Sequence, residues 1–192
     1  MKICFIDVET TGLYASRNAL LQVAGIIRID GKIKKKFDFK MQPFADAVID
    51  VNSEMATKHR LKDATAFKKF KKVLEDYINP YNKKDKFYFI GYNASFDESF
   101  IRAWFLRNED KYYGSYFWNP SVDLMQMIAR ALMRRDKRHE LKNMKLGTVA
   151  KYHGIKVKDD NLHDAAYDIK ITKDLYNIAC KRYKVWFVQN VD

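Results

Sequence analysis

The stretch FIDVETTGL, residues 5–13, places two carboxylates inside a segment that otherwise has the character of a buried strand. Side chains two residues apart on a strand point to the same face, so Asp7 and Glu9 are predicted to lie side by side. Two negative charges about 4 Å apart repel by about 4 kcal/mol at an effective dielectric constant of about 20. Taken alone, the pair is explained most simply as two solvated acids at a strand end, so its role depends on the rest of the chain.

The first forty residues predict an antiparallel three-stranded unit. Residues 1–8 form a short buried strand, and residues 20–30, LLQVAGIIRID, form a second that is rich in Ile and Val. Asp30 and Gly31 are a hairpin turn dipeptide. Residues 32–40, KIKKKFDFK, alternate apolar residues with lysine, which favours a strand that is wet on one side at a sheet edge.

After residue 40 the hydrophobic pattern is no longer that of strands alone. It indicates helices that alternate with strands. Helices are predicted over residues 64–78, 94–107, 123–135, 145–153 and 164–182, and further strands over 86–92 and 117–122. This order predicts one α/β domain with a mixed sheet and helices on both faces. The apolar tail, residues 184–192, is predicted to cover the core or to form an interface outside a domain that spans residues 1–183.

The composition favours a polyanionic partner. The 192 residues include 36 Lys and Arg against 24 Asp and Glu, a net charge of +12. That balance fits nucleic acid or an anionic membrane surface, and also a merely well-solvated surface. Asp7 and Glu9 interrupt the first apolar stretch, so no signal peptide or membrane span is expected there. Cys4 and Cys180 make neither a disulfide framework nor a zinc site, which points to a cytoplasmic protein.

A second polar cluster, GYNASFDESF at residues 91–100, lies where a buried strand gives way to a helix. Ser95 and Glu98 match a capping box, so Ser95 is predicted to be the N-cap. The capping box leaves Asn93 and Asp97 unexplained. Asp97 in the first turn stabilises the helix dipole in the simplest interpretation.

A third cluster, LHDAAYDI at residues 162–169, opens the last long helix. Asp164 is predicted to be its N-cap, with Asp168 one turn inside and His163 on the preceding loop. Each of these residues also has a plain explanation as a surface or first-turn charge. Asp123, with Gln126 three residues on, matches another capping box and is therefore excluded as a metal ligand.

The three clusters together resemble the motifs of the DEDDh 3′–5′ exonucleases, the family that includes the proofreading epsilon subunit of bacterial DNA polymerase, RNase T and oligoribonuclease. DVETTGL, YNASFDESF and HDAAYD occur in the family's order and spacing, and the similarity runs from residue 3 to about residue 180. The four acids of the motifs fall on Asp7, Glu9, Asp97 and Asp168. His163 stands five residues before the last acid.

The resemblance implies a ribonuclease H-like fold with a mixed five-stranded sheet. It also implies two divalent cations, one held by Asp7, Glu9 and Asp168 and the other by Asp7 with Asp97, and His163 as the base that takes a proton from water. All-oxygen ligands select Mg²⁺ or Mn²⁺. Six further positions match substrate contacts of the family: Thr10, Thr11, Leu13, His59, Asn93 and Phe96.

The expected activity is metal-dependent hydrolysis at nucleic-acid 3′ ends that releases 5′-mononucleotides, with DNA slightly favoured over RNA and single strands over duplexes. The alternatives are a 3′–5′ exoribonuclease, or a nucleic-acid-binding subunit of a polymerase or repair complex. A polymerase or other replication protein is a further expected partner. Basic runs at residues 34–36, 68–72 and 134–138 could follow a phosphate backbone, although each alone fits a solvated face.

Overall fold

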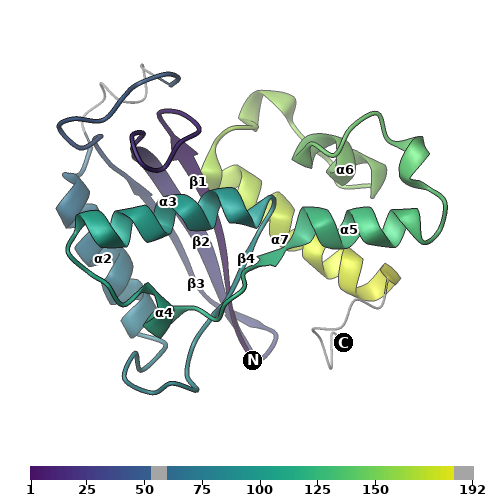
Figure 1. The fold of residues 1–192 in the computed structure, drawn as a ribbon. Helices are drawn as coiled ribbons and strands as arrows, with labels where there is room; N and C mark the ends of the chain where they lie inside the picture. The colour runs from purple at the N-terminus through teal and green to yellow at the C-terminus, as the bar shows by residue number, and fades with distance from the viewer. Residues whose placement is uncertain (53–59, 184–192) are drawn as a thin grey trace.

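A computed structural model describes residues 1–52 and 60–183, which form a five-stranded mixed sheet in the order β3-β2-β1-β4-β5, flanked by helices (Figure 1). The strands are β1 (Lys2–Thr10), β2 (Leu20–Ile29), β3 (Lys32–Lys40), β4 (Tyr88–Gly91) and β5 (Val122–Asp123). The first three strands pair antiparallel, whereas β4 is parallel to both β1 and β5. The predicted fold class is therefore confirmed.

The helices cover both faces of this sheet. They are α2 (Asp63–Glu75), α3 (Ala94–Arg107), α4 (Tyr113–Tyr116), α5 (Leu124–Met133), α6 (Leu146–Tyr152) and α7 (Ala165–Tyr183), with short 3₁₀ turns η1 (Arg138–Glu140) and η2 (Asp159–Asn161). In Figure 1, α2 and α3 lie on one side of the sheet, and α7 crosses the other side next to α5.

The β2–β3 hairpin follows directly from its turn sequence. Asp30 and Gly31 have φ angles of 47° and 79°, the left-handed conformations that a two-residue hairpin turn requires. Beyond the turn, β3 pairs only with β2 among the described strands and is the edge of their sheet, as the lysine pattern predicts. Its lysines are exposed, and an exposed charged edge resists pairing with other chains.

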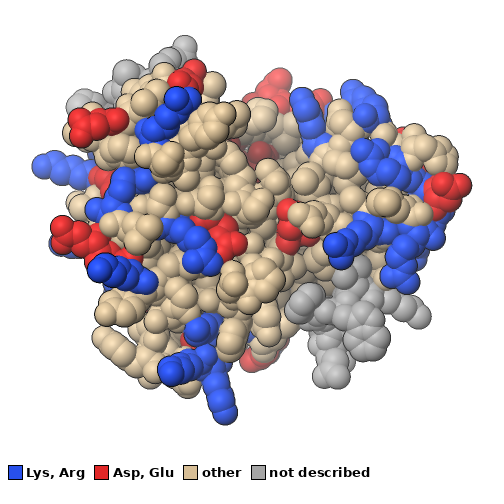
Figure 2. Space-filling model, viewed as in Figure 1, with Lys and Arg blue, Asp and Glu red and all other residues tan. Residues whose placement is uncertain are grey.

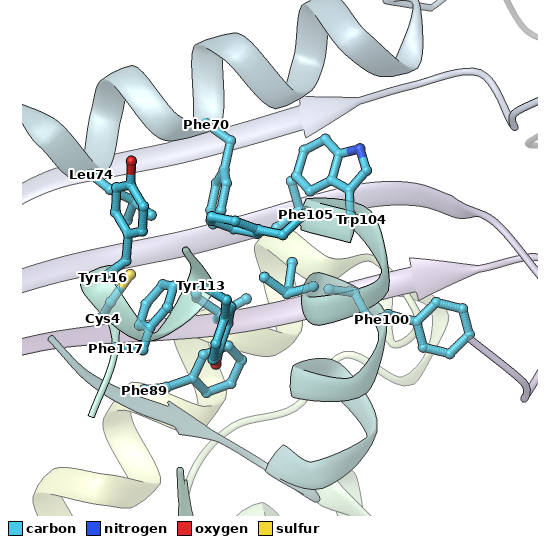
Figure 3. Close-up of a cluster of buried hydrophobic side chains, with 14 of the residues drawn as sticks. Cys4, Phe70, Leu74, Phe89, Phe100, Trp104, Phe105, Tyr113, Tyr116 and Phe117 are labelled. Atoms are coloured by element: carbon cyan, nitrogen blue, oxygen red, sulfur yellow. The ribbon is translucent and has the colours of Figure 1, made fainter. Parts of the chain in front are cut away.

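Two separate cores result from the alternation of side chains along β1. Cys4, Ile6 and Val8 pack with the helices α2 and α3, whereas Ile3 and Phe5 pack with α5 and α7. Figure 3 shows the first core, in which aromatic rings from both helices meet. The rings of Phe70 and Trp104, for example, have centroids 5.4 Å apart. Truncating a ring of this kind to alanine typically costs about 3–5 kcal/mol, so this core holds α3 firmly against the sheet.

The predicted N-cap of α3 is wrong. The helix begins at Ala94, one residue before Ser95, and the residue that precedes it is Asn93 with φ of 65°. Glu98 does not complete a capping box either. Its carboxylate accepts hydrogen bonds from Arg102 at 2.8 Å and from the hydroxyl of Tyr113. The tight turn out of β4 overrides the local capping pattern because Asn93 can adopt the left-handed conformation at small cost.

Other boundaries differ by smaller amounts. Of the strand predicted over 117–122, only Val122 lies in β5, and Phe117 forms an isolated bridge with Phe87. The short helix α4 carries no period long enough to be detected in the sequence. Helix α2 ends at Glu75, although Ile78 beyond it is buried as expected.

Two parts of the sequence analysis lie outside the described residues: His59 and the tail at residues 184–192. Within residues 1–52 and 60–183, no helix combines the length and the apolar character needed to cross a bilayer.

Candidate active site

The site begins where β1 extends past the end of β4. The pairing of these two parallel strands stops at Phe5 and Ile90, so the amide of Val8 has no partner in β4. The first turn of α3 lies at this point and supplies one, because Oδ1 of Asp97 accepts the Val8 N–H at 3.1 Å. Asp97 is 3% exposed, which makes it the most buried acid of the site.

Gly91 permits the close approach of α3 to the strand end. A Cβ atom at this position would lie 3.1 Å from Oδ2 of Asp97 and 3.1 Å from Cα of Ala94. Both distances are shorter than ordinary van der Waals contacts, so a larger residue would displace the carboxylate.

Asp123, at the end of β5, stabilises the turn between β4 and α3. Its Oδ1 accepts the amide of Met125 at 2.9 Å, which confirms the predicted cap of α5, and also the amide of Asn93 at 3.2 Å. The second contact was not predicted, because nothing in the sequence relates two positions on different strand ends. Asp123 is thereby linked to the residue from which α3 starts.

Helix α7 brings the third motif from the opposite face of the sheet. Asp164 accepts the amide of Tyr167 at 3.1 Å, as expected of an N-cap. His163, just before it, has φ of 71° and donates its backbone N–H to Oδ2 of Asp168 at 3.2 Å. The other carboxylate oxygen of Asp168, Oδ1, is buried and accepts no hydrogen bond within the part of the chain that the structure describes.

Asp7 and Glu9 face α7, as their alternation with Val8 requires. Glu9, His163 and Asp168 each offer a ligand atom, and these atoms lie within 4.8 Å of one another. Acidic atoms are visible in the hollow at the upper centre of Figure 2, whereas Lys and Arg gather on the α5–α6 side of it.

The carboxylates raise one another's pKa. Burial raises the pKa of Asp7, and the charges of Asp97, Asp168 and Glu9 raise it further. The pKa of Glu9 rises to about 8, first through burial and then through the charge of Asp168. Without a counter-charge, this cluster takes up protons at a pH where ordinary carboxylates are ionised.

The two helix-borne acids show the same direction of shift. Burial raises the pKa of Asp97, although the hydrogen bond from the Val8 amide acts against it. Burial also raises the pKa of Asp168, with the nearby His163 acting against it. Acids of one charge gathered in this way, one of them with a carboxylate oxygen that has no partner among the described residues, fit a divalent cation with oxygen ligands.

Asp164 is a further acid of the site that the sequence analysis assigned only to capping. Its charge raises the pKa of both Glu9 and Asp168. Its own pKa is lowered: burial opposes the shift, but the hydrogen bond from Lys40 and that from the Tyr167 amide outweigh it. Lys40 Nζ lies 3.3 Å from Asp164 Oδ2, a contact between β3 and a residue 124 positions away.

The predicted substrate contacts after β1 fall into two kinds. The hydroxyl of Thr10 donates to the carbonyl of Gly12 at 2.6 Å, and that of Thr11 donates to the carbonyl of Val48 at 2.6 Å. Both hydroxyls therefore stabilise the chain after β1 by bonding to its backbone. A substrate would be contacted by the backbone of Thr10 and Thr11, not by their hydroxyls. Leu13 is different, since its side chain is 74% exposed in the loop that follows β1.

The remaining substrate candidates lie near the start of α3. Asn93 is exposed, whereas Phe96 is half-buried with its ring 5.0 Å from that of Phe100. The position of the Phe96 ring is explained largely by its packing against Phe100.

A mixed five-stranded sheet that gathers acids at the carboxyl ends of its parallel strands defines the class of ribonuclease H-like nucleases. The sequence profile of the Exonuclease family, named after RNase T, matches residues 4–176. The chain therefore belongs to this exonuclease family, as its motifs indicate.

Its relatives include the PolC-type DNA polymerase III of Streptococcus pyogenes, 30% identical over 177 residues, and that of Ureaplasma parvum, 25% identical over 180 residues. These matches cover 91% and 90% of the chain but only 11% of each polymerase. The chain thus spans about a tenth of the length of these relatives.

Solved structures of Exonuclease I share the fold. The Escherichia coli enzyme in complex with a dT13 oligonucleotide superimposes with a TM-score of 0.70 at 20% identity, over 95% of this chain and 41% of the other. Exonuclease I of Methylocaldum szegediense gives a TM-score of 0.71 at 20% identity, over 96% and 41% of the two chains.

Proposed function

We propose that this protein is a metal-dependent 3′–5′ exonuclease that removes 5′-mononucleotides from the 3′ ends of single-stranded nucleic acid. The observation that carries the proposal is the convergence of Asp7, Glu9, Asp97 and Asp168, whose pKa values are all raised by burial. A cluster of this kind disfavours its own charge unless cations neutralise it. A module that only bound nucleic acid would have no use for it.

In this proposal, Asp7, Glu9 and Asp168 would hold one divalent cation, and Asp7 with Asp97 would hold a second. Such a pair would supply a nucleophile from water and stabilise the charge that develops on the oxygens. The unpaired Oδ1 of Asp168 is a ready ligand atom.

His163 takes the proton of the attacking water. Its ring is exposed at the rim and lies near the ligand atoms of Glu9 and Asp168, so proton transfer and release to solvent are both open to it. Histidine is suited to this role because its charge changes near neutral pH. The contact of its own backbone N–H with Asp168 positions the side chain relative to the acids.

Leu13 contacts the terminal base. An apolar side chain that is 74% exposed gains by packing against a base, and Leu13 follows the strand that carries the acids. Asn93, Phe96 and the backbone at Thr10 and Thr11 complete the proposed contacts with the last nucleotide, together with His59.

DNA is the favoured substrate over RNA, and a DNA polymerase is the favoured partner. The support comes from the relatives, which are DNA polymerases in which the similar segment is a small part, and from a structural neighbour that holds dT13. A 3′–5′ exoribonuclease remains the alternative, because contacts to the 2′-hydroxyl are what separate the two classes.

The test is digestion of matched DNA and RNA oligomers of one sequence, labelled at the 5′ end. With Mg²⁺ or Mn²⁺, we expect a ladder shortened one nucleotide at a time from the 3′ end, and none in excess EDTA. A 3′-phosphate-blocked oligomer is the matched control for the direction of attack. Undiminished cleavage in EDTA, or cleavage within the chain, would contradict the proposal.

A further inference from the structure

A groove of about 530 Å³ lies between the edge strand β3 and helix α2, away from the carboxylates. Its rim is formed by lysines of both elements: Lys35, Lys36, Lys68, Lys69 and Lys72. All five are exposed. In Figure 1, β3 and α2 lie next to each other along this side of the molecule.

Among the residues that the structure describes, four of these five ammonium groups have no anionic partner. Lys72 pairs with Asp76 one turn further along α2. The side chains of Lys35, Lys36, Lys68 and Lys69 make no hydrogen bond or ion pair with any residue of 1–52 or 60–183. Protection of a sheet edge explains lysines on β3 but not those that face them from α2. Cations gathered in this way attract a polyanion.

The floor of the groove is aromatic. Phe39 is half-buried, and its ring stacks on that of Phe37 with centroids 5.8 Å apart and an interplanar angle of 20°. Lysines along a groove with a partly exposed ring at its base are the combination with which proteins hold single-stranded nucleic acid. The cations follow the backbone, and the ring stacks with a base.

The edge strand connects this groove to the acidic site. Lys40, the last residue of β3, contacts Asp164, which is adjacent to His163. Lys40 and Lys35 are five residues apart, about 17 Å along a strand at about 3.4 Å per residue. Because side chains alternate along β3, Lys40 faces α7 and the groove faces α2, so a strand that leaves the site would have to pass over this edge to reach the groove.

We propose that the groove between β3 and α2 binds single-stranded nucleic acid at a distance from the 3′ end that is cut. Its link to cleavage rests on the proposed exonuclease function, but its binding does not. The groove makes affinity and turnover depend on the length of the strand, because a short oligomer occupies the acidic site alone.

The direct test compares two triple variants with the same loss of charge. Lys35→Gln, Lys68→Gln and Lys69→Gln remove three groove cations. Lys83→Gln, Lys84→Gln and Lys111→Gln remove three exposed lysines elsewhere on the surface. Binding of a fluorescent 30-nucleotide strand is followed by anisotropy in EDTA at increasing salt, so the measurement requires no catalysis. Circular dichroism melts of both proteins check that the fold is intact.

For the groove variant we expect binding about tenfold weaker or more, and a slope of log K against log salt reduced by about 2, since each phosphate contact on a single strand contributes about 0.7. The control variant should keep the wild-type slope. Equal effects in both proteins, or an unchanged slope in the groove variant, would overturn the proposal. The second result would leave an acidic protein partner as the occupant.

The Phe39→Leu variant separates stacking from charge. It keeps the floor apolar and removes the ring, so binding should weaken about fivefold or more with no change in the salt slope. Wild-type affinity in this variant would mean that the ring does not contact a base.

Cleavage adds a second readout. The groove variant should lose kcat/KM on the 30-nucleotide strand while its kcat/KM on a trinucleotide stays that of the wild type. Loss on both substrates would place these lysines in the acidic site and overturn the proposal. If the wild-type protein cleaves neither strand with Mg²⁺ or Mn²⁺, the exonuclease function fails, and the anisotropy result still decides the groove.

Discussion

Asp97 and Asp168 reach the same site from opposite faces of the sheet, and they are held differently. Asp97 is almost fully buried and accepts the otherwise unpaired N–H of Val8, so it completes the backbone hydrogen bonding of β1. Asp168 accepts only the N–H of His163 at the rim, and its second oxygen has no partner among the described residues.

This difference separates two functions that a motif cannot distinguish. Asp97 belongs to the scaffold as well as to the proposed cation site, because its removal leaves a buried N–H unsatisfied. Asp168 is available for a ligand and costs the fold little to change. Both acids are expected to be essential for activity, but only one of them for the stability of the strand end.

The largest expected effect is on the rate of cleavage. Asp7→Ala or Asp168→Asn removes a proposed cation ligand, and we expect turnover to fall by about 10⁴-fold, since a bound cation contributes several kcal/mol to catalysis. Rates at saturating Mn²⁺ measure the loss. Asp160→Asn is the matched control: it changes an exposed acid outside the site and should retain wild-type activity. Near-wild-type rates for Asp168→Asn would refute the site.

The next effect concerns His163. Replacement by Gln should lower the single-turnover rate constant by about 10²–10⁴-fold, because the general base is lost. Titration with Mn²⁺ should show unchanged cation affinity, since His163 is not proposed as a ligand. His139→Gln, which changes an exposed histidine, serves as the control. Weakened Mn²⁺ binding would instead make His163 a ligand.

The third prediction tests the comparison through stability in EDTA. Asp97→Ala should be less stable than Asp97→Asn by about 1–3 kcal/mol, because only Asn retains an acceptor for the buried Val8 amide. The same pair of substitutions at Asp168 should differ less, since the His163 N–H is only partly buried. Urea denaturation of the four variants provides the free energies of unfolding. Equal Ala–Asn differences at the two positions would mean that Asp97 stabilises the fold no more than Asp168 does.

The last prediction concerns the change of stability with pH. The pKa of Glu9 is raised in the folded protein from 4.5 to about 8, so its contribution to stability is present below about pH 4.5 and is lost as the pH rises through about 8. In EDTA, the wild type should therefore lose more stability than Glu9→Gln between these values. Melting temperatures from pH 5 to pH 8 measure this difference, and added Mg²⁺ should abolish it. Parallel curves for the two proteins would contradict the raised pKa.

Several elements were predictable because their signals are local. The Asp30–Gly31 turn, the lysine-rich edge strand and the cap at Asp123 each depend on a few adjacent residues, and the structure contains all three. The cap at Ser95 was mispredicted for the same reason. Its pattern is a good local match, but the route of the chain out of β4 decided where α3 begins.

By itself, the sequence determined the order of the elements and the α/β class, because periodicity is a property of neighbouring residues, and its resemblance to a known family identified the motif acids. Only the tertiary structure decided what those acids contact. The hydrogen bond between Asp97 and Val8 joins positions 89 residues apart, and that between Lys40 and Asp164 joins positions 124 apart. Contacts over such separations arise from how the helices pack on the two faces of the sheet, and that packing depends on the whole core rather than on any one stretch of the chain.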